Sequence, residues 1–281
     1  MKERVLTEKQ IVAFAEYLKS EERSKNTVTK YIRDVKAFAV YVGNAQVTKE
    51  IVISYKSKLL SESYAVRSIN SMLASINSLF VFLGWENLKV KSIRIQSPIY
   101  CPAERELTKA EYIRLVNVAG QKGNERLKLL IQTICGTGIR VSELQYITVE
   151  EVKCGETMVS LKGKTRAVFI VRKLQKNLLR YAAEQKITSG AIFITRNGKP
   201  MNRTNIWREM KRLCKQAGVN PQKVFPHNLR HLFARTFYGI EKDIAKLADI
   251  LGHSSINTTR IYIVTTGNEH RRRMENMRLI I

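Results

Sequence analysis

Residues 86–106 read ENLKVKSIRIQSPIYCPAERE, and this stretch divides the 281-residue chain into two parts of different character. It loses the regular spacing of apolar residues that precedes it, and it contains Pro98 and Pro102. Proline restricts its own backbone and that of the residue before it, so a helix rarely continues through such a segment. We therefore expect a linker over residues 86–106, between a domain at 1–85 and a second domain at 107–281.

The part before this linker has the pattern of helices throughout. Residues 7–10 have the spacing of a capping box, and the apolar residues that follow recur at intervals of three and four. Comparable patterns begin near Asn26, near Thr48 and shortly before residue 69, and Gly43 and Gly84 stand where the second and fourth would stop. The pattern predicts a four-helix domain.

The part after the linker mixes helices with short strands. Helical spacing covers residues 108–119 and 124–135, and it returns in the last third of the chain. Residues 158–161 and 167–171 flank a tight Lys-Gly-Lys turn, which is typical of a β-hairpin, and residues 191–194 read as a third short strand. The expected fold class is therefore mainly α with a small antiparallel β-sheet, as a helical domain followed by an α+β domain.

The charge of the chain points to a polyanionic partner. Lys and Arg number 49 against 24 Asp and Glu, a formal net charge of +25. The excess is distributed, with 16 basic against 9 acidic residues in 1–100 and 33 against 15 in 101–281. Nucleic acid is the leading candidate partner. A ribosomal or generic phosphate-binding protein is the alternative, and composition alone does not address catalysis.

Several classes of protein are disfavoured by the composition. No apolar run approaches the roughly 18 residues of a membrane helix, and the first thirty residues are too rich in Lys and Glu for a signal peptide. The four cysteines have no Cys-x-x-Cys spacing, which argues against a zinc site and a disulfide framework. We expect a bacterial cytoplasmic, nucleoid-associated protein without a membrane partner.

Four short segments of the second domain carry side chains suited to phosphate chemistry. They are GTGIRVSEL at 136–144, KGKTR at 162–166, PHNLRH at 226–231 and LGHSSINTTRIY at 251–262. Arginine forks match pairs of phosphate oxygens and can neutralise a phosphoryl transition state. A tyrosine nucleophile needs nearby cations and a base such as histidine, and a departing sugar oxygen needs a proton donor such as lysine. No carboxylate cluster of the kind that holds catalytic Mg²⁺ is evident, so no metal and no cofactor are expected.

Each of these residues alone is more often structural. A buried arginine, a capping histidine or a core tyrosine is common, and the hairpin lysines could form a solvated turn. We interpret His231 as a residue that either supports the site residues from behind or packs in the core, and His270 as a surface residue near the end of the chain. The order of the four segments together favours the functional interpretation.

In that order the segments resemble those of the tyrosine recombinases, the phage-integrase-type site-specific recombinases. The stretch around Arg140 is similar to the first arginine motif of the family, His227-Asn-Leu-Arg230 to its His-x-x-Arg motif, and Leu-Gly-His253 with Tyr262 nine residues later to its terminal motif. The resemblance covers essentially the whole chain, because a helical, SAM-like core-binding domain before a linker and a mixed catalytic domain after it is the family layout. It implies cutting and rejoining of DNA strands through a 3′-phosphotyrosyl intermediate, for integration, excision, inversion or dimer resolution.

The resemblance also implies roles for individual residues. Tyr262 would be the nucleophile, His227 would assist proton transfer and Lys162 would be the general acid, with the scissile phosphate bound by Arg140, Arg230 and His253. The turn Lys-Gly-Lys-Thr-Arg is one residue shorter than the usual family pattern, so Lys164 is an alternative to Lys162. The length leaves no room for the extra amino-terminal domain of many integrases, so the chain is similar to the compact Xer-like members.

Contacts with DNA are predicted on both domains. Helix starts and polar or basic helix faces supply the candidates, and the alternative for each is a solvated surface. The candidates are Lys25, Thr27, Lys30, Arg67, Ser71, Lys164, Arg166, Arg208, Lys211, Arg212 and Lys215. The last four are spaced as a stripe on one helix after residue 204.

The expected partners are duplex DNA target sites and further copies of the chain. The apolar end of the tail at 268–281 and the family resemblance imply a homo-tetramer on DNA through exchange of this tail, with accessory or directionality proteins as further partners. Two rival functions are weighed. A type IB topoisomerase shares the chemistry but is expected to show lysine in place of His227, and a non-catalytic DNA-binding regulator would not need all six catalytic positions filled.

Overall fold

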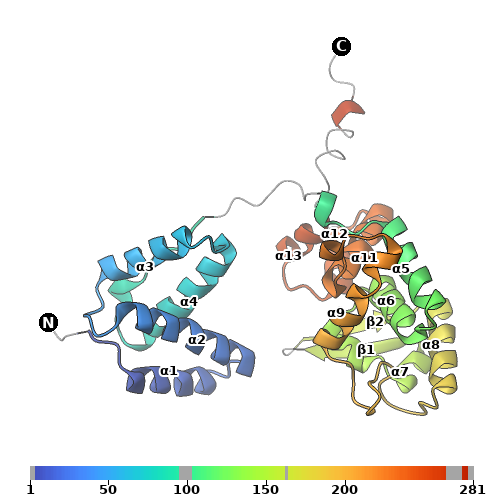
Figure 1. The fold of residues 1–281 in the computed structure, drawn as a ribbon, viewed down its shortest axis with the longest axis horizontal. Coiled ribbons are helices and arrows are strands. Elements are labelled where there is room, and N and C mark those ends of the chain that lie inside the picture. The colour runs from blue at the N-terminus through green and yellow to red at the C-terminus, as the bar shows by residue number, and fades with distance from the viewer. Residues whose placement is uncertain (1–3, 95–102, 162–163, 264–273, 278–281) are drawn as a thin grey trace. The chain divides into compact units, whose positions relative to one another are not determined.

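The structure, a computed structural model, describes residues 4–94, 103–161, 164–263 and 274–277. The chain forms two compact units, Met1–Ser97 and Pro98–Ile281 (Figure 1), and each has its own hydrophobic core. The described residues are mostly helical, with one two-stranded antiparallel sheet. The fold class expected from the sequence is confirmed.

The described residues of the first unit form four α-helices, as predicted. They are α1 (Glu8–Ser20), α2 (Lys25–Val42), α3 (Lys49–Ser61) and α4 (Val66–Phe82), followed by the 3₁₀ turn η1 (Glu86–Leu88). Hydroxyl groups cap the first three helices, since Thr7, Ser24 and Thr48 each accept from a backbone N–H three residues later. The core between these helices is centred on Phe14, Phe38 and Phe80, none of which is exposed.

The first part of the predicted linker belongs to this unit. Leu88 and Val90 are buried in its core. The side-chain amide of Asn77 donates to the Val90 carbonyl at 2.9 Å and accepts from the Val90 N–H at 3.0 Å, and Asn70 binds the backbone of Ile93 in the same way. The loss of helical spacing after residue 86 therefore marks an extended segment fixed to α4, because paired amides satisfy its backbone.

The second unit is built around helix α6 (Glu125–Thr137). Its apolar residues are buried on several sides, against α5 (Lys109–Gln121), α8 (Arg172–Glu184) and α11 (Pro226–Glu241). The remaining described α-helices are α7 (Val149–Cys154), α9 (Arg203–Lys211), α10 (Cys214–Ala217), α12 (Ile244–Leu251) and α13 (Ile256–Ile263), and the 3₁₀ turns are η2 (Ala103–Arg105), η3 (Val141–Tyr146) and η4 (Pro221–Lys223). A smaller apolar cluster joins α11, α12 and α13.

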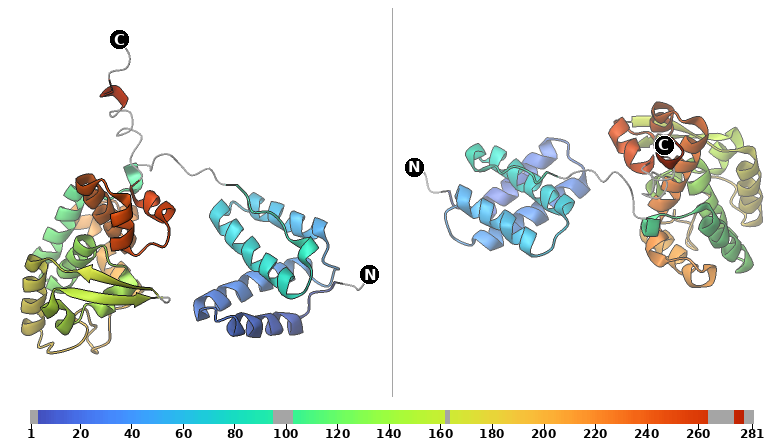
Figure 2. Two further views of the ribbon diagram at one scale, coloured as in Figure 1. Left: turned by 180° about the vertical axis from the view of Figure 1, so that it is seen from behind. Right: turned by 90° about the horizontal axis from the view of Figure 1, so that it is seen from above.

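The predicted hairpin is present as strands β1 (Glu156–Leu161) and β2 (Lys164–Phe169). They pair antiparallel from Glu156 opposite Phe169 to Leu161 opposite Lys164. Because strand residues alternate between faces, Val159 and Val168 face the core while Met158 and Phe169 are exposed. Strand β2 packs against α12, so the hairpin lies beside the carboxy-terminal helices (Figure 2).

Two local predictions were wrong. Residues 191–194 form no strand and make only the isolated bridges Thr148–Ala191 and Ile194–Pro200, so their apolar run reflects burial of Ile192 and Phe193 in the core. The basic stripe after residue 204 is not on one helix, because α9 ends at Lys211 and α10 begins at Cys214.

Candidate active site

Two helices that end in glycine bring the predicted site together. Gly138 ends α6 and Gly252 ends α12, both in the left-handed region with φ of +65° and +64°. A Cβ on Gly138 would lie 2.5 Å from the ring of Phe233, and one on Gly252 would lie 2.3 Å from Arg166 Cδ. Only glycine is compatible with this conformation and this space. The two helix ends therefore converge, and their carbonyl groups point at arginines.

Arg230 is at the centre of the site. It lies on α11 and is only 1% exposed. Its guanidinium donates to the Gly138 carbonyl and, at 2.6 Å, to the Leu251 carbonyl, and Nη2 lies 3.1 Å from His253 Nε2. Burial and the neighbouring Arg140 charge lower the pKa of Arg230 to about 10, so the group remains a cation at neutral pH. This single side chain holds the ends of α6 and α12 together.

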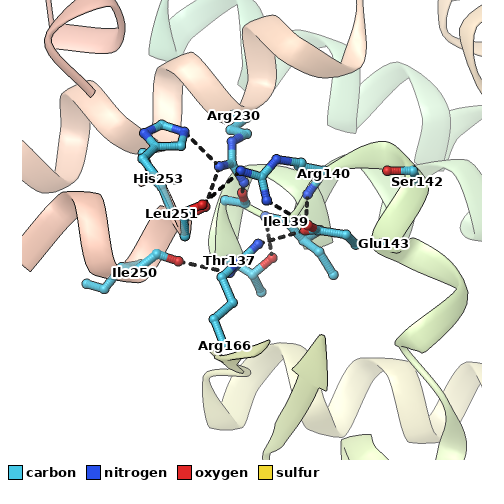
Figure 3. Close-up of polar contacts among 12 residues, drawn as sticks. Thr137, Ile139, Arg140, Ser142, Glu143, Arg166, Arg230, Ile250, Leu251 and His253 are labelled. Atoms are coloured by element: carbon cyan, nitrogen blue, oxygen red, sulfur yellow. Dashed lines mark hydrogen bonds and ion pairs between the residues drawn. The ribbon is translucent and has the colours of Figure 1, made fainter. Parts of the chain in front are cut away.

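Glu143 is a buried carboxylate that binds two further arginines. Its Oε1 accepts from Arg140 Nη1 at 2.7 Å, and its Oε2 accepts from Arg166 Nη2 at 2.7 Å and from the Arg140 backbone N–H at 2.9 Å (Figure 3). Burial raises the pKa of Glu143, but hydrogen bonds from Arg140 and the charges of both arginines outweigh this and keep it below its usual range. Glu143 is therefore ionised and fixes both guanidinium groups.

Arg140 and Arg166 differ in what they offer to a ligand. The Arg140 side chain is 33% exposed, and its Nη2 donates to the Gly252 carbonyl at 3.2 Å. The Arg166 side chain is only 10% exposed, and its Nη1 donates to the Ile250 carbonyl at 2.8 Å. Arg166, which the sequence suggested as a DNA contact, thus lies inward and ties β2 to the end of α12. Arg140 is the more open cation.

The contacts of His253 define its protonation. Its Nδ1 lies 2.8 Å from Thr259 Oγ1, and its Nε2 lies 3.1 Å from Arg230. Because a guanidinium can only donate, Nε2 must be the acceptor and Nδ1 carries the proton toward the threonine hydroxyl. Burial, with the Arg230 and Arg140 charges, lowers the pKa of His253 to about 4, in agreement with a neutral ring.

Tyr262 lies among these groups in its own chain. It is 7% exposed, on α13. Its ring stacks on His231 with centroids 4.2 Å apart and planes at 16°, meets His227 edge-on at 5.2 Å, and lies 4.9 Å from the His253 ring. The Arg230 guanidinium carbon is 5.8 Å from the ring centroid. A phenol group is thus placed beside one guanidinium group and three imidazoles.

His227 lies at the start of α11 and is more exposed than His231, His253 and Tyr262. Partial desolvation of its ring, together with the charges of Arg230, Arg203 and Arg140, lowers the pKa of His227. A histidine held neutral at neutral pH can accept a proton. Of the six predicted catalytic residues, the structure brings five together; Lys162 lies outside the described residues, and Lys164 is the first residue of β2.

The predicted DNA contacts are distributed over both units. Lys25, Arg67 and Ser71 are exposed on the first unit, as are Arg208, Arg212 and Lys215 on the second. Three others are engaged within the fold: Thr27 Oγ1 lies 2.8 Å from Ser24 Oγ, Lys30 Nζ lies 2.7 Å from Asp34, and Lys211 binds the Pro221 carbonyl. The tail from residue 268 lies outside the described residues apart from 274–277, and so does His270.

Sequence reasoning missed Glu143, Thr259 and the contact of His231 with Tyr262. The signal for Glu143 was an acidic residue within a basic motif, three positions after Arg140. Neither of the other two had a sequence signal: the Thr259 contact depends on how α13 folds back on the turn after α12, and the His231 stack depends on how α11 and α13 pack. Within the described residues, no three His, Cys, Asp or Glu side chains are grouped to hold a metal ion, and the described helices include none long and apolar enough to cross a membrane.

Comparison with known proteins gives matches for both units. The model of the phage integrase family matches residues 105–269, and that of the phage integrase N-terminal SAM-like domain matches residues 11–87. Tyrosine recombinase XerA of Pyrococcus horikoshii is 31% identical over 274 residues, covering 95% of this chain and 93% of that protein. Tyrosine recombinase XerA of Pyrococcus furiosus is 28% identical over 288 residues, covering 100% and 98%.

Solved structures show a similar fold. The XerH site-specific recombinase bound to its difH substrate, in a pre-cleavage complex, has a TM-score of 0.69 and 19% identity, covering 95% of this chain and 84% of that one. At this level of identity the comparison concerns the fold alone.

Proposed function

This chain belongs to the phage integrase family and is a tyrosine-type site-specific recombinase, a DNA breaking-rejoining enzyme, and from this premise we propose that Tyr262 is its nucleophile. The observation that carries the proposal is the burial of Tyr262 against Arg230 and His253 of the same chain. Relatives named as Xer recombinases favour recombination over relaxation of supercoils, and so does histidine at position 227.

Phosphate binding is assigned to the cations of the site. Arg140 and Arg230 supply guanidinium groups whose positions are fixed by Glu143 and by the carbonyls of α6 and α12. Such preorganised donors stabilise the charge that develops on the phosphate oxygens in the transition state. His253 Nε2 now accepts from Arg230, and the ring proton is on Nδ1. Binding of a phosphate oxygen by His253 therefore requires Nε2 to gain a proton, because a phosphate oxygen only accepts.

The chemical step exchanges one phosphodiester for another. The Tyr262 oxygen attacks the scissile phosphorus, the bond from phosphorus to the 5′ oxygen breaks, and the DNA 3′ end remains on the tyrosine. His227 takes the phenolic proton, and Lys162, with Lys164 as the alternative, gives a proton to the leaving 5′ oxygen. Attack by a 5′-hydroxyl reverses the step. One ester replaces another, so the reaction needs no external energy source.

The partners follow from the same premise. We assign duplex DNA as the substrate, bound through the basic residues of both units, at the nucleoid. Two sites and four copies of the chain, joined through the tail at 268–281, would form the recombining complex, with accessory or directionality proteins setting its outcome. Binding dominated by phosphate contacts predicts a steep fall of affinity with salt.

Capture of the covalent intermediate tests this function. The chain is incubated with a library of nicked duplexes carrying randomised sites, denatured in detergent, and the attached DNA is sequenced. Wild-type protein is expected to retain a defined sequence, and Tyr262→Phe is expected to retain none while binding the recovered duplex as tightly.

Tyr238→Phe, a change on α11 in the same apolar cluster, serves as the matched control and is expected to form the adduct. A Tyr262→Phe protein that forms adducts would exclude the assignment. Relaxation of any supercoiled plasmid, independent of sequence, would favour the topoisomerase instead.

A further inference from the structure

His231 makes the closest ring contact with Tyr262, and the proposed mechanism does not use it. The two rings stack with centroids 4.2 Å apart and planes at 16° to each other. His227 and His253 approach the same tyrosine ring at 68° and 48°, from 5.2 Å and 4.9 Å. Among the described rings that contact Tyr262, His231 alone lies parallel to its face.

The surroundings of His231 hold its ring in place. It lies on α11 one turn after His227, whose ring meets it edge-on at 4.7 Å. Within the part of the chain that the structure describes, ring contacts rather than hydrogen bonds fix this imidazole, since no hydrogen bond to it is found there. Burial and nearby charges, including His227 and Arg235, lower the pKa of His231 to about 3. The ring is therefore neutral at neutral pH and adds no positive charge beside the cations of the site.

Helix α13, which carries Tyr262, is a short element that follows the Gly252 turn. The direction of its phenol group is set by what the ring packs against. On one face that is the His231 imidazole, and elsewhere it is the phosphate-binding residues Arg230 and His253. A stacked aromatic pair favours one orientation of its rings by about 2- to 12-fold over an unpaired ring.

We propose that His231 is a positioning residue for the nucleophile: its imidazole stacks on the Tyr262 ring and holds the phenol oxygen toward the phosphate site. This inference rests on the proposed function, because it assumes that Tyr262 attacks. It assigns His231 no proton transfer and no contact with DNA. Its role is geometric, so any flat, neutral ring at position 231 should largely replace it.

The test separates attack by Tyr262 from the work of the phosphate site. Attack is measured as the single-turnover rate of adduct formation on a suicide substrate that carries one half-site. The sequence of this half-site comes from the adduct-capture experiment described above. The phosphate site is measured separately, with a strand whose 3′ end carries a p-nitrophenyl phosphodiester, which the protein joins to a 5′-hydroxyl without using Tyr262. His231→Ala is expected to slow attack about 10-fold, while half-site affinity and joining stay within about 2-fold.

Two further variants complete the design. His231→Phe keeps a neutral ring and is expected to attack within about 3-fold of wild type, with an unchanged pH profile. Phe237→Ala removes a ring from the same apolar cluster, on the same helix, and is expected to leave attack near wild type.

Three results would overturn the inference. Attack by His231→Ala at the wild-type rate would show that the stack positions nothing. Equal loss of attack and joining would show that His231 shapes the phosphate site. A His231→Phe protein as slow as His231→Ala would show that the imidazole nitrogens are needed. If wild-type protein forms no adduct, the proposed function fails instead.

Discussion

Replacing Glu143 with glutamine is expected to destabilise the site by releasing Arg140 and Arg166. The Glu143 side chain is 1% exposed and binds Arg140 and Arg166, each at 2.7 Å. Glutamine keeps the shape but removes the charge, and its amide N–H groups then face arginines that can only donate. Removing one partner of a buried ion pair costs about 3–5 kcal/mol. Because Arg140 is 33% exposed and water can compensate it, we expect a loss of about 3 kcal/mol.

The consequence for the reaction follows from the same contacts. Arg140 would keep its charge but lose the carboxylate that orients it, so cleavage should slow by about 10- to 100-fold, less than for loss of a whole donor. Urea unfolding followed by circular dichroism and single-turnover cleavage measure the two effects.

Glu209→Gln is the matched control for this change. Glu209 pairs with Arg126 at 2.8 Å on the same unit, with side chains 20% and 27% exposed. Because this pair is less buried than the contacts of Glu143, the change should cost less than Glu143→Gln and leave cleavage unchanged. If Glu143→Gln unfolds at the same urea concentration as Glu209→Gln and cleaves like wild type, the account of the arginine cluster is incorrect.

Three further predictions concern other parts of the site. Gly138→Ala should lower the free energy of unfolding in urea by about 2–4 kcal/mol, because a Cβ there is strained and meets a phenyl ring of α11. Gly218→Ala has a similar φ but open space around the Cβ, and it should cost about 1 kcal/mol. Equal costs for the two variants would contradict the packing argument. The pKa values of His231 and His253, about 3 and about 4, lie below the ordinary value near 6.5. The folded chain therefore binds fewer protons than the unfolded chain, and its unfolding free energy should fall as the pH drops from 6.5 to 4. The fall should be up to about 1.4 kcal/mol per pH unit for each histidine. A urea midpoint that is equal at pH 7.5 and pH 5 would refute this. A substrate with sulfur at the bridging 5′ position should restore cleavage by Lys162→Ala, because a thiolate leaves without a proton. If this substrate restores cleavage by Lys164→Ala and not by Lys162→Ala, Lys164 is the general acid.

Local sequence rules predicted the helices well. The capping box that opens α1 at Thr7 is present, and glycine ends α2 at Gly43. These features depend on neighbours within one turn of helix, so the sequence contains them directly. The candidate residues Arg140, Arg230, His253 and Tyr262 were likewise found from short motifs, and the structure brings them together.

What the sequence could not predict depends on packing between distant segments. Arg166 was predicted to face DNA, yet it lies inward because Glu143, 23 residues earlier, accepts from it. Lys30 was proposed on the same grounds of charge, yet it pairs with the buried Asp34 and donates to Ser75 on α4 at 3.0 Å. Composition gives the number of cations, and only tertiary structure shows which of them are already neutralised.

The central claim is that one chain carries both the phosphate-binding arginines and the tyrosine that attacks. Mixing Tyr262→Phe protein with Arg230→Ala protein on a suicide substrate tests it directly, since each lacks a different half of the site. The account predicts that the mixture forms no more covalent adduct than the two proteins do separately, because Tyr262 lies against Arg230 of its own chain. Adduct formation restored by mixing would show that the tyrosine is delivered to a neighbouring chain and would contradict the account.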